Sequence, residues 1–177
     1  MKKNLFIAFI LLAMTQWVSA QKFAKLDQSP VDIAYFPSDA SYKGLAPSVK
    51  VVYSRPAKKG REIFGKLVPF GEVWRAGADE ETEIRFYKDA TIGGTTVPAG
   101  NYSFFIIPEK DSWTFIINKQ TDRWGAYSYD KNLDVVRVKV DLKKASSPIE
   151  NFSISIQEGL VLQAGWDNVY AELPIKM

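Results

Sequence analysis

The chain has 177 residues, a formal net charge of +3, and neither histidine nor cysteine. Without these residues it has no imidazole base, no imidazole or thiolate metal ligand and no thiolate nucleophile, which excludes serine-histidine hydrolases, cysteine enzymes and zinc sites built on Cys or His. The small net charge also argues against a nucleic-acid partner, because phosphate binding needs a basic excess gathered on one face.

Residues 1–20 are predicted to be a signal peptide. Lys2 and Lys3 precede an apolar run, and Val18-Ser19-Ala20 has the small-residue spacing of a signal peptidase site. The run is shorter than the ~20 residues needed to cross a bilayer, and no later segment is comparable, so we expect no membrane span in the mature chain. We therefore expect cleavage after Ala20 and a location in the periplasm or outside the cell. Removal of the two lysines leaves 21 basic and 20 acidic residues.

The mature chain is predicted to be all-β. Segment 21–47 shows little pattern, whereas 48–177 contains runs in which apolar and polar residues alternate, as in strands with one face in a core and the other in water. Such runs occupy residues 82–88, 135–142, 152–157 and 168–173. About eight to ten short strands at this spacing predict a single-domain β-sandwich, jelly-roll or Greek-key in its connections.

Two runs, 102–107 and 113–118, are apolar at consecutive positions and should be central strands buried on both faces. Turn signals at Gly93-Gly94, at 108–111 and at Ser146-Ser147-Pro148 separate the expected strands. No segment has the length and period of a helix, although 61–66 could form one turn.

Two long loops are expected, at 54–70 and 119–133, and long ordered loops on a rigid scaffold often carry binding residues. The first contains a cluster of Arg55, Lys58, Lys59 and Arg61, which together could hold a carboxylate, sulfate or phosphate. The alternative is a solvated loop whose arginines pair with acids elsewhere in the fold.

Between these loops, strand alternation would place Trp74 and Arg75 on opposite sides of the chain. One interpretation puts Trp74 in the core and bonds Arg75 to Glu80 across a turn made by Gly77. The other makes Arg75 and Glu80 ligand contacts at an edge of the sandwich. The two are compatible, because an arginine–carboxylate pair can both hold a loop and face a pocket.

The second loop places Trp124 in polar surroundings, where it would stack on a ligand, with Tyr129 as a second wall, or else plug the open end of the sandwich. Glu80 and Asp134 could form the acid and base of a glycosidase, which needs two carboxylates about 5 to 10 Å apart. The acidic run at 79–81 lacks the alternating pattern of a calcium loop, so neither a metal nor a cofactor is expected.

Five motifs occur in order: S-R-P-x-x-K-G-R-x-I-F-G at 54–65, V-W-R-x-G-A-D-E at 73–80, P-A-G-x-Y at 98–102, W-G at 124–125 and D-x-x-R at 134–137. Together they resemble a domain-of-unknown-function family of small exported proteins from Gram-negative bacteria, over roughly Val49 to the C-terminus. The resemblance implies export and a β-rich single domain, and it implies no reaction. The family pattern has Asn where this chain has Asp79 and Thr where it has Ala76.

Our leading hypothesis is a noncatalytic binding module for a small polar or anionic ligand or an envelope carbohydrate. The alternatives are a carboxylate-dependent glycan hydrolase and a structural partner that docks another envelope protein by a sheet edge. The oligomeric state is not predicted. The candidate ligand-binding residues are Arg55, Arg61, Trp74, Arg75, Glu80, Trp124, Tyr129, Asp134 and Arg137.

Overall fold

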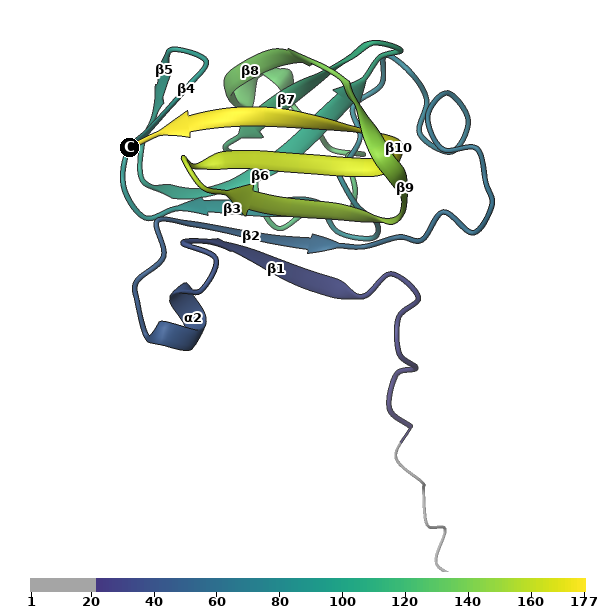
Figure 1. Ribbon diagram of the computed structural model, residues 1–177, viewed down its shortest axis with the longest axis horizontal. Coiled ribbons are helices and arrows are strands. Elements are labelled where there is room, and N and C mark those ends of the chain that lie inside the picture. Colours follow the sequence, from purple (N-terminus) through teal and green to yellow (C-terminus); the bar gives the residue numbers. More distant parts are fainter. Residues whose placement is uncertain (1–21) are drawn as a thin grey trace, which may run out of the picture.

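Two antiparallel sheets pack face to face in the computed structural model, which describes residues 22–177 (Figure 1). The predicted signal peptide therefore lies outside the described residues. The larger sheet has the order β1-β2-β3-β6-β7-β8 and the smaller has the order β5-β4-β10-β9. The strands are β1 Val31–Phe36, β2 Val49–Ser54, β3 Thr82–Phe86, β4 Ala90–Ile92, β5 Thr95–Val97, β6 Gly100–Pro108, β7 Ser112–Asn118, β8 Asp134–Asp141, β9 Lys143–Gln157 and β10 Val161–Lys176.

The alternation in the sequence corresponds to the two faces of these strands. In β3, Ile84 and Phe86 are buried between the sheets, whereas Glu83 and Arg85 are exposed. Strand β9 repeats the scheme with Phe152 and its apolar partners turned inward. The predicted all-β sandwich is therefore confirmed, and apolar burial between its two sheets supplies its core.

The outer face of the larger sheet is also partly covered. Phe105 of β6 and Ile116 of β7 are buried but lie outside the core cluster between the sheets. The loop at 119–133 contacts this face, where the Tyr129 ring packs edge-on against Phe105 with ring centroids 5.3 Å apart. This explains the unbroken apolar runs of β6 and β7, which were predicted to be buried on both faces.

Three local features differ from the sequence-based expectation. Strand β1 lies within segment 21–47 and pairs along its length with β2, so the sheet begins before residue 48. Strand β9 runs through Ser146-Ser147-Pro148, where a turn was expected; it lies at the edge of its sheet, where proline is tolerated. Residues 61–66, where a helical turn was considered, contain no helical residue; among residues 22–177 the helical elements are α2 Ala40–Lys43 and the 3-10 turn η1 Lys131–Leu133.

Several segments remote in sequence meet at one end of the sandwich. Strand β2 runs toward residues 54–70 at this end, where the N-terminal segment also enters β1; the β4–β5 hairpin and the C-terminus lie at the other end (Figure 1). Across residues 22–177, no helix has the length and apolar character required to span a membrane.

Candidate functional site

A basic pocket of about 520 Å³ opens at the loop end of the sandwich. Its charged lining residues are Lys59, Arg61 and Arg75, and no acidic residue lines it. Its walls come from the N-terminal segment, the loop at 54–70 and the segment at 74–78. The lining residues are Gln28, Ser29, Pro56, Ala57, Lys59, Arg61, Leu67, Val68, Trp74, Arg75, Gly77, Ala78 and Trp166.

Two tryptophans form the apolar part of this pocket. The rings of Trp74 and Trp166 stack with centroids 5.8 Å apart and planes 17° apart. Each indole N–H donates to a backbone carbonyl, Trp74 to Gly77 at 3.1 Å and Trp166 to Glu150 at 3.1 Å. Because both N–H groups are already bonded, the rings are fixed; Trp166 is buried behind Trp74, which is partly exposed and offers apolar surface to the pocket.

Arg75 is the unusual residue of the site. Within residues 22–177, its guanidinium takes part in no hydrogen bond or ion pair, and its Nε atom is buried without a partner. Glu80, its predicted partner, is exposed and forms a backbone bridge with Trp124. A half-buried cation without a partner is costly, and such a group is satisfied when an anion binds.

The backbone around Arg75 turns through two left-handed residues, Ala76 with φ 53° and Asp79 with φ 63°. Thr82 stabilises the turn by donating from Oγ1 to the carbonyl of Ala76 at 2.6 Å. Asn and Asp adopt the left-handed region more readily than most residues, which gives a backbone reason for either one at position 79.

The other two cations of the pocket each have hydrogen-bond partners. Arg61 donates from Nε to the carbonyl of Lys58 at 3.0 Å and from Nη2 to the carbonyl of Ala57. Lys59 donates from Nζ to Oε1 of Gln28 at 3.0 Å, which joins the loop to the N-terminal segment. Both side chains are exposed and retain N–H donors for a ligand.

Glu81, which the sequence analysis did not select, anchors the second loop. Its side chain is 4% exposed, and its two carboxylate oxygens each accept from the backbone N–H of Arg123 at 2.8 Å. Ser103 Oγ also donates to it at 3.1 Å. This buried carboxylate fixes the base of the loop at 119–133, which carries Trp124.

Trp124 lies outside the basic pocket, with 59% of its surface exposed. Its neighbour Gly125, with φ 66°, lies directly against Arg75, because a Cβ there would lie 2.4 Å from Nη1. The second loop therefore meets the pocket at Arg75, and Trp124 stands beside that contact.

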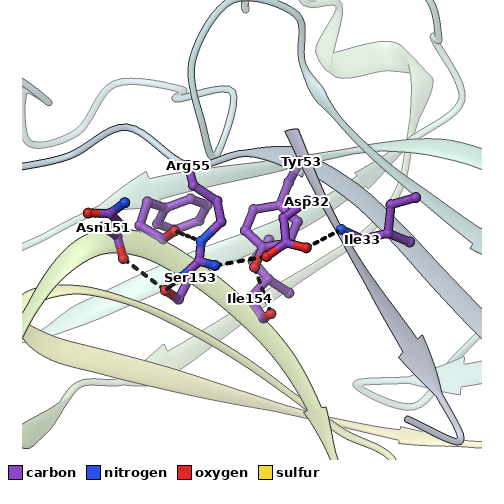
Figure 2. A network of polar contacts seen from close by, with 8 residues as sticks. Asp32, Ile33, Tyr53, Arg55, Asn151, Ser153 and Ile154 are labelled. Carbon is purple, nitrogen blue, oxygen red and sulfur yellow. Dashed lines mark hydrogen bonds and ion pairs between the residues drawn. The ribbon is translucent and has the colours of Figure 1, made fainter. Parts of the chain in front are cut away.

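Arg55 is a clamp between the sheets (Figure 2). It donates from Nη1 to Asp32 of β1 at 2.8 Å, from Nη2 to Ser153 Oγ of β9 at 2.8 Å, and from Nε to the carbonyl of Phe152 at 3.3 Å. Tyr53 adds a bond from its hydroxyl to the carbonyl of Ile154 at 2.9 Å. Arg55 does not line the basic pocket, and these contacts give it a structural role.

Tyr129, Asp134 and Arg137 come together in a second cluster at the start of β8. Asp134 accepts from Tyr129 at 2.7 Å, from Arg137 Nε at 2.5 Å and from Asn118 Nδ2 at 2.7 Å. Burial, followed by the hydrogen bond to Asp134, raises the pKa of Tyr129 to about 12. The cluster holds the loop onto the sheet, and none of its members lines the basic pocket.

A larger groove of about 760 Å³ runs between β1 and β9. It is lined by Asp32 and Glu158 and by no basic side chain, and Asp32 is already paired with Arg55. It contains none of the candidate residues from the sequence. The basic pocket is the better candidate because it brings together Arg61, Trp74 and Arg75 with unsatisfied charge.

The chain belongs to the family described as Protein of unknown function (DUF2911), whose model matches residues 37–175. The family resemblance inferred from the sequence motifs is thereby confirmed. Comparison with curated proteins and with solved structures gives no match.

Proposed function

We propose that this member of the DUF2911 family is a noncatalytic binding protein that holds a small anionic ligand in the basic pocket. The observation that carries the proposal is Arg75, which lines a pocket together with Lys59, Arg61 and no acid and whose guanidinium has no protein partner among residues 22–177. An anion would complete it, since a guanidinium can donate two parallel hydrogen bonds to a carboxylate, sulfate or phosphate.

The pocket also suits a ligand with an apolar part. A volume of about 520 Å³ falls within the roughly 300 to 1,000 Å³ of small-molecule sites. Trp74 offers a ring face whose N–H is already satisfied by Gly77. The ligand would therefore carry an anionic group for Arg75 and an apolar face for Trp74.

The positions and hydrogen-bond partners of the carboxylates favour binding over catalysis. The pocket is lined by no carboxylate that could act as a general base. Asp134, one member of the imagined hydrolase pair, accepts from three donors in a separate cluster. These contacts support a structural role for Asp134.

The proposal is tested by thermal unfolding of the chain beginning at Gln21, with carboxylates, sulfate, phosphate and neutral sugars as probes. We expect anions, and not neutral sugars, to raise the melting temperature; at 100 times its Kd a ligand adds about 2.7 kcal/mol. Arg75→Met should remove the shift. The matched control is Arg85→Met, an exposed arginine over the Tyr87 ring. Equal shifts in wild type and Arg75→Met would refute the proposal.

We place this function outside the cytoplasm. The lysine-led apolar segment ending at Val18-Ser19-Ala20 supports export and cleavage. The test is the intact mass of the protein recovered from an envelope fraction, which should correspond to a chain beginning at Gln21. A mass retaining residues 1–20 would contradict it.

A further inference from the structure

We infer that the natural ligand is an acidic oligosaccharide, which places its anionic ring in the basic pocket and its next ring on an aromatic ledge formed by Trp124 and Tyr127. This inference rests on the proposed function and names the class of ligand. It adds a second subsite, on the loop at 119–133, which the pocket alone does not contain.

The two subsites meet at Gly125. A Cβ at this position would lie 2.4 Å from Nη1 of Arg75 and 3.1 Å from Cε2 of Tyr127. Arg75 lines the basic pocket, and its guanidinium and the ring of Tyr127 both lie close to Gly125. A ligand whose charge is held by Arg75 reaches the ledge with its next unit.

The ledge is exposed although its base is firmly held. Trp124 is 59% exposed and Tyr127 is 84% exposed. The backbone N–H of Arg123 donates to both carboxylate oxygens of Glu81, and Trp124 forms a backbone bridge with Glu80. The two aromatic side chains therefore extend from a loop whose base is anchored, and each offers an exposed ring face on which a flat ring can stack.

The chemistry of the two subsites selects an acidic sugar chain. Sugar rings present flat apolar C–H faces that stack on indole and phenol rings, while a carboxylate or sulfate on the neighbouring ring supplies the negative counter-charge for Arg75. The cationic pocket complements that charge, since Lys59, Arg61 and Arg75 line it without an acid. A neutral saccharide would leave Arg75 unpaired, and a lone anion would leave the ledge bare.

The experiment measures affinity by calorimetry for three oligomer series of one to four sugars: galacturonic acid, heparin-derived sulfated saccharides and neutral cello-oligosaccharides. We expect at least a tenfold gain in affinity from monomer to dimer or trimer in an acidic series. The carboxylated and sulfated arms decide which anion is preferred. Equal or tighter binding of the neutral series would overturn the inference.

The double variant Trp124→Ala/Tyr127→Ala should reduce the ratio of oligomer to monomer affinity to near one. Tyr42→Ala is the matched control, because Tyr42 is 92% exposed on α2 and should leave that ratio unchanged. Unfolding midpoints of both variants verify that they fold, as expected for exposed side chains.

The outcomes separate the two claims. If small anions bind through Arg75 but chain length makes no difference, the oligosaccharide inference is wrong and the proposed function stands. If the double variant keeps the length-dependent gain in affinity, Trp124 and Tyr127 do not form the second subsite, and the proposed function again stands. If no anion binds in any series, both fall together.

Discussion

Gly125 lies against the guanidinium of Arg75 so closely that a Cβ at this position would stand 2.4 Å from Nη1. The residue also has φ 66°, a backbone conformation that residues other than glycine rarely adopt. Two loops remote in sequence therefore meet at a point with room for a hydrogen and little more.

Gly125→Ala should disturb both the backbone and Arg75. Left-handed strain and displacement of Nη1 predict a loss of about 1 to 2 kcal/mol in the free energy of unfolding and weaker anion binding. Denaturant unfolding and anion titration measure the two effects. Gly94→Ala is the control, because Gly94 has φ 84° with open space around it, so it carries the backbone strain alone. If both variants bound anions as wild type does, the contact with Arg75 would be irrelevant to the pocket.

Arg75→Met should separate binding from stability. An unpaired, half-buried cation stabilises little, so the variant should unfold at equal or higher denaturant concentration, with a gain of about 0.5 to 1 kcal/mol. Its anion binding should be lost. This pairing of greater stability with lost binding marks a residue kept for function, and a loss above about 2 kcal/mol would instead assign Arg75 a structural role.

Glu81→Gln should release the loop at 119–133. The glutamine amide keeps one acceptor oxygen, but its NH₂ group would face the N–H of Arg123, so two donors would meet. We therefore expect a loss of about 1 to 3 kcal/mol in the free energy of unfolding. Faster hydrogen exchange at Arg123 would locate the effect. The neighbouring Glu80→Gln, at an exposed side chain, should change stability by less than about 0.5 kcal/mol. Equal effects of the two substitutions would contradict the anchoring role.

Asp32 of β1 and Arg55, which follows β2, should be energetically coupled. The pair is partly exposed, with side chains 45% and 34% accessible, so a double-mutant cycle with alanine should give about 0.5 to 1 kcal/mol. Arg55→Ala alone should cost more than Asp32→Ala, because it also breaks bonds to Phe152 and Ser153. A coupling energy of zero would mean that the two residues act independently.

Tyr129 should make stability sensitive to alkaline pH. Its pKa is raised to about 12 in the folded protein, mainly by burial, whereas an unfolded tyrosine titrates near ~10. The stabilisation is therefore complete below pH ~10 and is lost as pH rises toward 12, because only the unfolded chain releases the proton in that window. Unfolding at pH 9 and pH 11 should show a smaller loss in Tyr129→Phe than in wild type. An identical loss would place the alkaline sensitivity elsewhere.

Much of the fold could be predicted from the two-residue period, because one face of each strand packs into the core and the other faces water. In β3, Ile84 and Phe86 are buried and Arg85 is exposed, as the alternation predicted. The period gives no information on what covers an outer face. The burial of Phe105 identifies the covered face of β6, but the sequence does not say that the loop at 119–133 covers it.

The sequence also does not show which distant residues meet, and this explains why Glu80 was selected as a candidate instead of Glu81. The two acids are adjacent and chemically alike, and burial of Glu81 depends on the position of Arg123, 42 residues further along the chain. Of the candidate residues, the structure gathers Arg61, Trp74 and Arg75 in one pocket. It places Arg55 in a clamp between the sheets, because Asp32 and Ser153 meet it there through pairings the sequence does not reveal.

The basic pocket reaches back to Gln28 and Ser29, and β1 begins at Val31, whereas the family match begins at residue 37. A recombinant fragment trimmed to the family boundary would lose an edge strand and one wall of the cavity. Such a fragment would expose β2 as a new sheet edge, which invites aggregation. Ligand screens on this domain therefore call for material that starts close to the predicted cleavage site, with any affinity tag kept at the C-terminus.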